Sequence, residues 1–597
     1  MRIEEGFQQA SDKRCTFLRI KRVYLGSCYT RPVETTFEEV EPDLVHFGDA
    51  VITTVRDLGA GAKIYPPQLV QYDQWGRRVD ELQTSEGWRD LKAAAQKEGI
   101  PGIFYERKHR EFSRIYGFAK VILMVGDSQE VFCPLSMTDG TARIIELIGN
   151  ERAKKDIFPR LISRDPAMAF TAGQWMTERP GGSDVSLTET NAKSTGESTS
   201  YGPKYVLDGF KWFSSATDSE VSVALARTGT LEQGSRGLSL FLIPLRRPLF
   251  PSPSSPKPSP TSNNIFVHRL KNKIGTHALP TAELSLQETE GYLLGDLGKG
   301  VKNITPVLNI TRVWSSTCSL GNLRKCLAMA TSYASARRIQ SGKMLLKDAP
   351  IHVAQLAEVN LLYRALSHLV FGVISLLGKA ECGEGTKEQR EEVERRLRVL
   401  TPVVKAYAAE KACTGMEEAM ACLGGAGYME ENGFGRSIRD ALVEKIWEGT
   451  VTVLALDLAR SAADPKNMEA FISWARSVVA STPSSLVSKL NSSFAILDKA
   501  LAELSTTYTG KQISPLVPRP TLLLVGSIAS SVYLLEHAIW SYNQREREAD
   551  IDVDVFARWI VESGLEANVE VVRKAKDAQL VKERVKANER IVFGTKL

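Results

Sequence analysis

Long stretches of the chain place apolar residues three to four positions apart, the spacing that buries one face of an α-helix. These stretches are residues 86–98, 113–125, 320–338, 351–377 and 391–422. Between them, Val221–Thr228 and Leu238–Pro244 are short runs of apolar and β-branched residues separated by glycine-rich turns, a pattern that predicts strands. The order therefore predicts helices, then a small β domain, then helices again.

This change of pattern predicts an α+β fold that is mainly α. We place an N-terminal helical domain at residues 1–165, a middle β domain at 166–295, a C-terminal helical domain at 296–460 and an additional helical region at 461–597. Residues 248–264 are rich in proline and serine and are expected to form a disordered insertion in the β domain. Residues 134–140 are expected to form a loop or cap before a helix that starts at Thr141.

Composition narrows the functional classes. Of the 597 residues, 43% are hydrophobic and 24% are charged, which are ordinary values for globular domains. The net charge of +6 is small for this length, and residues 461–597 hold 17 Lys and Arg against 16 Asp and Glu, so a nucleic-acid partner is not expected. The seven histidines form no metal-binding motif. The most apolar stretch, Thr521–Trp540, contains Glu536 and His537, which favours a buried helix over a membrane span.

Three glycine- and hydroxyl-rich segments are candidates for ligand binding. Met176–Val185 offers Thr and Ser hydroxyls and free backbone N–H groups that can line a heteroaromatic ring, although its Gly-Gly-Ser-Asp also makes a good turn. Gly209–Ser215 places adjacent aromatic residues before hydroxyls, which suits a flavin edge or strand packing equally well. Leu423–Tyr428 contains paired glycines that let backbone approach a phosphate-bearing ligand, or that end a helix.

A carboxylate lies at a break between two helical runs. The run from Ser437 to Ile446 stops at Trp447, and a second apolar run follows Thr450. Glu448 lies in the break, where an apolar cavity would raise its pKa and make it a usable base. The alternative is an ordinary helix stop and N-cap with an exposed Glu448.

Together, in this order, these four segments resemble the acyl-CoA dehydrogenase flavoprotein family over residues 40–460. The likeness is greatest to the AidB-type branch, and it shows in residues 72–82, 134–138, 176–184, 211–213 and 446–450. The resemblance implies an N-terminal helical domain, a middle β-barrel-like domain and a C-terminal four-helix bundle. It also implies FAD as the cofactor.

The resemblance places roles on individual residues. It implies contacts to FAD from Thr177, Ser183, Trp212, Ser215, Arg338, Gly424, Gly425 and Thr450. Arg338 and the two glycines would touch the FAD of a neighbouring subunit, which implies a homodimer or homotetramer. Arg312 would lie near the CoA end of the substrate. Glu448 would be the catalytic base, removing the α-proton of an acyl-CoA thioester while the β-hydride passes to flavin N5, and the product would be a trans-2-enoyl-CoA.

The electron acceptor and the location of the protein stay open at this stage. The acceptor is either an electron-transfer flavoprotein or oxygen, and oxygen would make the protein an acyl-CoA oxidase. A second alternative is a flavin-bearing, DNA-binding protective protein of the AidB type, which should have a strongly basic terminal domain. The final residues Thr595, Lys596 and Leu597 differ by one small hydroxyl residue from a peroxisomal address, so peroxisomes are the expected location, with the cytoplasm as the alternative.

Overall fold

The computed structural model describes residues 33–247, 261–383, 385–509 and 513–594. The chain divides into two compact units. Residues 43–109 and 116–314 form one, here called the sheet unit, and most of the other, here called the helical unit, comes from residues 315–597. Residues 248–260 of the predicted insertion and the predicted peroxisomal address, 595–597, lie outside the described residues. The predicted disorder is wrong for residues 261–264, because Thr261–Ser262 form a short strand and Asn263 is buried, donating to the carbonyls of Pro244 and Glu290.

Helices and one hairpin precede the main sheet. The helices are α3 (Val33–Ala50), α4 (Arg56–Ile64), α5 (Glu86–Lys97), α6 (Gly102–Glu106), α7 (Ser113–Met124), α8 (Phe132–Ile148), α9 (Glu151–Asp156) and α10 (Phe158–Leu161). Strands β1 (Gln68–Tyr72) and β2 (Arg78–Gln83) pair in an antiparallel hairpin. The helices predicted at 86–98 and 113–125 are therefore confirmed as α5 and α7.

The prediction of a loop at residues 134–140 is wrong, because α8 begins at Phe132 and runs through them. Pro134 lies in the first turn, where a missing backbone N–H costs no helical hydrogen bond. The hydroxyls of Ser136 and Thr138 donate to the carbonyls of Cys133 and Pro134, both at 2.7 Å. These polar side chains are satisfied inside the helix and need no loop.

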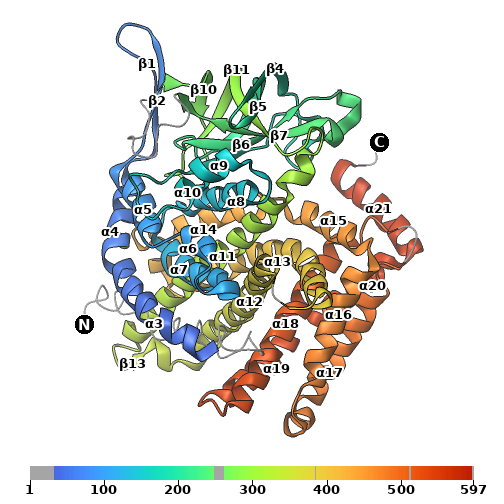
Figure 1. Cartoon of the computed structure of the whole chain (residues 1–597). Helices are drawn as coiled ribbons and strands as arrows, with labels where there is room; N and C mark the ends of the chain where they lie inside the picture. Colours follow the sequence, from blue (N-terminus) through green and yellow to red (C-terminus); the bar gives the residue numbers. More distant parts are fainter. Residues whose placement is uncertain (1–32, 248–260, 384, 510–512, 595–597) are drawn as a thin grey trace. The chain divides into compact units, whose positions relative to one another are not determined.

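The main sheet closes on itself. Its strands are β3 (Ala172–Trp175), β4 (Asn191–Thr199), β5 (Gly202–Ser215), β6 (Val221–Arg227), β7 (Leu238–Pro244), β10 (Ile265–Leu270) and β11 (Thr281–Leu294). Strand β11 pairs with β5 and β7, β5 with β4, β4 with β6, and β6 with β7. Five strands thus form a ring, to which β3 and β10 add at the sides (Figure 1). The short strands β8 (Arg246–Arg247) and β9 (Thr261–Ser262) form a separate pair.

Because side chains alternate between the two faces of each strand, they fill a hydrophobic core on either side of the sheet. In β7, Leu240 and Leu242 pack with Ile144 and Ile145 of α8, whereas Phe241 belongs to the core on the other side of the sheet. Both faces of β7 are buried, which explains why its sequence is apolar at nearly every position. Figure 1 shows α8 and α9 beside the sheet.

From Gly300 onward the described chain is almost entirely helical. The first helices are α11 (Gly300–Ala336), α12 (Pro350–Cys382), α13 (Lys387–Ala421), α14 (Phe434–Leu442) and α15 (Val451–Ala462). Strands β12 (Arg338–Ile339) and β13 (Met344–Leu345) form a small hairpin after α11. A Cβ at Gly415 of α13 would lie 2.9 Å from both Leu323 of α11 and Leu362 of α12, so the three helices pack closely there. These helices and the sheet domain confirm the predicted fold class.

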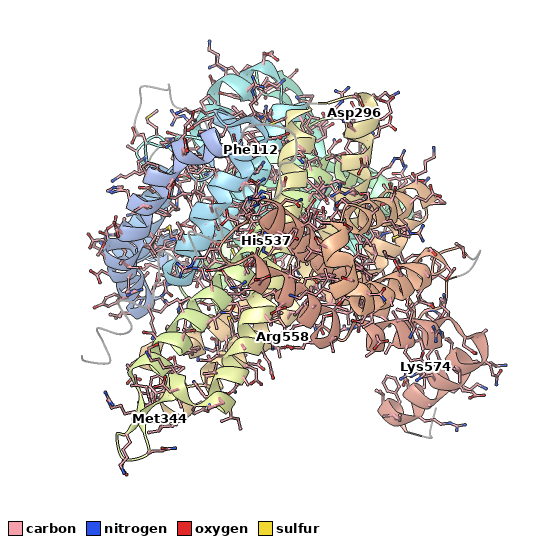
Figure 2. All side chains as sticks on the ribbon, turned by 90° about the horizontal axis from the view of Figure 1, so that it is seen from below. Phe112, Asp296, Met344, His537, Arg558 and Lys574 are labelled. Atoms are coloured by element: carbon pink, nitrogen blue, oxygen red, sulfur yellow. The ribbon has the colours of Figure 1, made fainter. Side chains whose placement is uncertain are left out.

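The predicted additional region is helical as well. It contains α16 (Pro465–Ala480), α17 (Ser484–Ser505), α18 (Pro518–Asn543), α19 (Ala549–Glu562), α20 (Leu565–Lys576) and α21 (Ala578–Phe593). Helix α18 packs against α12 and α15. His537 of α18, labelled in Figure 2, is 5% exposed and lies 3.4 Å from Asp552 of α19.

Two described helices, α12 and α18, are long and apolar enough to cross a membrane by length and composition. However, 83% and 89% of their most apolar stretches are buried within the protein. Such burial is typical of core helices, which pass the same test.

Candidate functional site

The chain between α14 and α15 makes a tight turn that carries Glu448. A short 3-10 helix (Val443–Lys445) continues α14, and then Glu448 takes φ = 55° and Gly449 takes φ = 105°. A left-handed conformation is uncommon for a residue with a side chain, and such residues gather at functional sites. Thr450 then caps α15, its hydroxyl accepting from the N–H of Val453 at 3.3 Å.

A second carboxylate lies under this turn. Glu444 is 1% exposed, and its Oε2 accepts hydrogen bonds from Ser315 Oγ at 2.5 Å and from Trp447 Nε1 at 2.6 Å. Burial raises the pKa of Glu444 to about 7, against the two hydrogen bonds and the charge of Lys405, and the charge of Glu448 raises this pKa further. Glu444 therefore titrates near neutral pH beside the predicted base.

A buried lysine fixes the other side of the turn. Lys405 of α13 is fully buried, and its Nζ donates to the carbonyl oxygen of Gly449 at 2.7 Å. The turn is thus held from α13 through Gly449 and from α11 through Ser315 and Glu444. Glu448 is partly buried. A carboxylate on a turn fixed in this way has a defined direction, which proton abstraction requires.

Reading the sequence for motifs missed Glu444. In the structure, Ser437, Asp440, Ala441 and Glu444 are all buried and fall at intervals of three, four and seven residues. A glutamate on the buried face of a helix needs a partner or a raised pKa. Three of these four residues are polar, so the sequence shows no apolar face here and carries no signal that Glu444 is buried.

In the sheet unit, the loop after β3 is held by a buried ion pair. Lys211 Nζ lies 2.6 Å from Glu178 Oε1, and the two side chains are 0% and 2% exposed. Glu178 also accepts from the N–H of Glu189 and from the hydroxyl of Thr190, both at 2.6 Å. Burial opposes ionisation of Glu178, but Lys211 and these hydrogen bonds hold its pKa below the ordinary value. The carboxylate therefore ties the loop to β4 and β5.

The predicted FAD contacts of the sheet unit lie on this loop and on the adjoining end of β5. The N–H of Trp212 donates to the carbonyl of Thr177 at 3.0 Å, so these two residues are neighbours. Ser215 lies three residues farther along β5, with its hydroxyl 3.0 Å from that of Thr281. Ser183 is exposed on the same loop as Thr177. The structure thus groups these residues around one strand end.

The surfaces of this group suit a flavin. Thr177 and Ser215 supply partly buried hydroxyls. Phe213, next to Trp212, is 50% exposed, and the ammonium of Lys271 lies over both aromatic rings, 4.5 Å and 3.1 Å from their centres. A Cβ at Gly181 would lie 2.0 Å from the carbonyl oxygen of Asp184, so the loop can form only with glycine there. Hydroxyls and backbone N–H groups form a donor set that matches a heteroaromatic ring with carbonyl oxygens.

The remaining predicted FAD contacts lie in the helical unit. Arg338 is exposed on the β12–β13 hairpin and donates to the carbonyl of Gly342 at 3.0 Å. Gly424 and Gly425 are exposed in a short 3-10 helix (Gly424–Tyr428), and a Cβ at either would meet nothing within 4 Å. Tyr428 at the end of that helix is 87% exposed. These glycines therefore leave space for a ligand or another chain.

Arg312, the predicted contact to the CoA end, lies in α11 within the sheet unit and is 8% exposed. Its role stays a prediction. The structure brings Glu448 and Thr450 together in one turn, and Thr177, Trp212 and Ser215 at one strand end. The individual roles of all these residues likewise stay predictions.

Three family models match most of the chain. Residues 33–165 match the model described as the adaptive response protein AidB N-terminal domain. Residues 173–289 match the acyl-CoA dehydrogenase middle domain, and residues 298–463 match the acyl-CoA dehydrogenase C-terminal domain.

A relative from Caenorhabditis elegans extends the likeness through the C-terminal region. Acyl-CoA dehydrogenase family member 11 is 36% identical over 578 residues, which is 94% of this chain and 88% of that protein. The crystal structure of C. elegans ACDH-11 in complex with C11-CoA superposes with a TM-score of 0.86 at 33% identity, covering 99% of this chain and 95% of that one.

Two other proteins share parts of this likeness. The putative acyl-CoA dehydrogenase AidB of Escherichia coli is 28% identical over 415 residues, which is 68% of this chain and 70% of that protein. An acyl-CoA dehydrogenase from Bacillus anthracis, solved in complex with FAD, superposes with a TM-score of 0.69 over 94% of this chain and 92% of that one. Its identity is 16%, so it shows the fold alone.

Proposed function

The chain belongs to the acyl-CoA dehydrogenase family of FAD-dependent oxidoreductases, and on that premise we propose that it oxidises an acyl-CoA thioester to a trans-2-enoyl-CoA. The observation that carries the proposal is the left-handed turn at Glu448, held by Lys405 and by the Ser315–Glu444–Trp447 hydrogen bonds. That turn presents a single carboxylate in a fixed direction, as removal of an α-proton requires.

Glu448 is the base in this proposal. The thioester acidifies its α-carbon, and Glu448 takes the α-proton onto its carboxylate. The partly buried setting of Glu448 limits hydration of the carboxylate, which keeps it basic enough for this step. Thr450 and Gly449 hold the backbone on the C-terminal side, so the carboxylate keeps its direction while the proton moves.

Each unit carries proposed FAD contacts of its own. Those of the sheet unit, to the flavin ring, are Thr177, Ser183, Trp212 and Ser215, and those of the helical unit are Arg338, Gly424, Gly425 and Thr450. Bound FAD supplies the acceptor for the two electrons that leave with the β-hydrogen. The hydroxyls of Thr177 and Ser215 would orient the ring.

The first substrate class to test is a saturated acyl-CoA of medium chain length. The support comes from ACDH-11 of C. elegans, which was solved with C11-CoA and is 33% identical over nearly the whole chain. Arg312 is the residue proposed to contact the CoA end.

The test is an anaerobic titration of the purified, FAD-loaded protein with acyl-CoAs of different length and branching, followed by flavin absorbance. Wild type should bleach with at least one chain length. Glu448→Gln should keep FAD and slow bleaching by at least about a hundredfold, because only the base is lost. Undiminished bleaching in that variant would remove Glu448 from the mechanism, and a protein that no acyl-CoA bleaches would refute the proposed reaction.

The electron acceptor is decided by a second measurement on the same sample. A dehydrogenase should pass electrons to an electron-transfer flavoprotein and react slowly with oxygen. An acyl-CoA oxidase should reoxidise rapidly in air and release hydrogen peroxide in equal amount to the enoyl-CoA. We propose the dehydrogenase, since the matched models are those of acyl-CoA dehydrogenases.

A further inference from the structure

The carboxylates of Glu444 and Glu448 are linked through Trp447, which lies between them in the sequence. Glu444 Oε2 accepts from Trp447 Nε1, and Trp447 directly precedes Glu448. The same oxygen accepts from Ser315 Oγ. A shift of the Glu444 side chain would therefore be transmitted to Trp447 and to the turn that presents Glu448.

Polar and charged groups from several elements face Glu444. From α11 it meets the hydroxyl of Ser315, and from α13 it meets the charge of Lys405. Cys413 of α13 is also near, but burial raises the pKa of its thiol to about 11, so the thiol stays neutral between pH 6 and pH 8. Glu448 is the other charged group with a large effect on the pKa of Glu444, and it raises that pKa.

We propose that Glu444 is a positioning residue for Glu448, which holds the turn through Trp447 and sets the strength of the base by its own charge. This inference rests on the proposed function, because it takes Glu448 as the base. When Glu444 is neutral, Glu448 is the only negative charge of the pair. When Glu444 ionises, repulsion favours protonation of Glu448 and makes it a stronger base.

The test is the rate constant of anaerobic flavin reduction by a saturating acyl-CoA, measured by stopped flow from pH 6 to 8. Glu444→Gln keeps an oxygen that can accept from Ser315 and Trp447 but cannot ionise. It should match wild type at pH 6 and be about five- to tenfold slower at pH 8, because it lacks the rise that follows ionisation of Glu444. If the ratio of the variant rate constant to the wild-type rate constant is the same at pH 6 and pH 8, the proposal is overturned. This holds whether the variant is as fast as wild type or uniformly slower.

Ser315→Ala provides a second variant that keeps the carboxylate. Ser315 donates to Glu444 and so favours its ionised form. Its removal should move the midpoint of the rate increase to higher pH, and an unmoved midpoint contradicts the proposal. If Glu444→Gln does not fold, this variant alone decides.

A readout without turnover comes from thermal unfolding. Because burial raises the pKa of Glu444, the folded state keeps a proton between about pH 4.5 and pH 7 that the unfolded chain has lost, and stability falls over that range. Glu536, whose pKa burial also raises to about 7, contributes a fall over the same range, so Glu444→Gln should make the fall smaller without removing it. An unchanged fall in Glu444→Gln contradicts the titration on which the proposal depends.

Glu536→Gln is the matched control. Burial also raises the pKa of Glu536 in α18 to about 7, so this variant should change the pH dependence of unfolding without altering that of flavin reduction. An altered reduction profile in the control would refute a specific role for Glu444. Failure of Glu448→Gln to stop bleaching would instead refute the proposed base, so the two failures are distinguishable.

Discussion

At the scale of single residues, Glu444 and Glu448 differ in backbone and in burial although they lie four positions apart. Glu448 takes φ = 55° on a turn, whereas Glu444 is 1% exposed and accepts two hydrogen bonds. The first is recognisable in the sequence, because a glycine and a hydroxyl residue interrupt the helical pattern beside it. The second is hidden, since a glutamate followed by lysine in a helix normally lies in solvent.

The clearest pH prediction at this scale concerns Glu536. Burial raises its pKa to about 7, against the charges of Arg396 and Lys379. The folded state therefore keeps a proton between about pH 4.5 and pH 7, and stability is lost as pH rises through that window. Glu536→Gln should be more stable than wild type at pH 8 by up to about 3 kcal/mol, at about 1.4 kcal/mol per pKa unit.

Urea unfolding at pH 4.5 and pH 8 measures this difference. At pH 4.5 the advantage of the variant should be nearly gone, because folded wild type holds the proton and the unfolded chain, with a glutamate pKa of 4.5, holds it about half of the time. Equal advantages at the two pH values would show that Glu536 is ionised in the folded protein.

At the scale of elements, the loop after β3 depends on one buried carboxylate. Glu178 joins the loop to Glu189 and Thr190, which directly precede β4, and to β5 through Lys211. Lys211→Met should cost about 3–5 kcal/mol, because it leaves Glu178 buried without its counter-charge. The loop carries Thr177 and Ser183, so the same variant should lose FAD during gel filtration.

Lys211→Met combined with Glu178→Met tests the cause. With both charges gone, urea unfolding should recover at least half of the lost stability, since paired apolar side chains replace a buried ion pair at little cost. FAD retention should stay low, because the bonds to Glu189 and Thr190 are also gone. A double variant no more stable than the single one would show that packing of the lysine stem, not the unpaired charge, causes the loss.

The sequence predicts elements well where burial is one-sided. The long helices α12 and α13 keep a regular apolar spacing, and they coincide to within a few residues with the stretches predicted at 351–377 and 391–422. The prediction from sequence failed at α8, where Pro134 and the following polar residues are typical of a loop. The helix forms because tertiary burial is strong: thirteen of its residues are buried, and its hydroxyls bond within the helix. Such burial depends on segments distant in the sequence, so the residues of α8 alone do not indicate it.

At the scale of the whole molecule, some predicted FAD contacts are exposed in the single chain. Arg338, Gly424 and Gly425 lie at the surface of the helical unit, next to Tyr428, which is 87% exposed. We propose that they complete the FAD site of a second copy of the chain. Motifs can predict such residues, but the sequence cannot tell which copy of the cofactor they contact, because a residue pattern is the same in every subunit.

Gly425→Val separates a role in assembly from a role in folding. A Cβ at this position meets nothing within 4 Å, and Gly425 does not need a left-handed backbone, so the single chain should accommodate valine. If the cofactor of a second copy lies there, the added side chain should lower FAD content and oligomer size while the unfolding temperature of the apoprotein changes little. Light scattering, flavin absorbance and thermal unfolding of the apoprotein measure the three quantities.

Arg338→Ala should have the same effect through a lost cation, whereas the exposed neighbour Arg337→Ala serves as its matched control. FAD binding should become more dependent on protein concentration in Gly425→Val and Arg338→Ala, because a shared cofactor couples cofactor affinity to association. A wild-type oligomer size with full FAD in both variants would show that each chain holds its cofactor alone. A lowered unfolding temperature of the Gly425→Val apoprotein would instead show that the glycine serves the fold of its own chain.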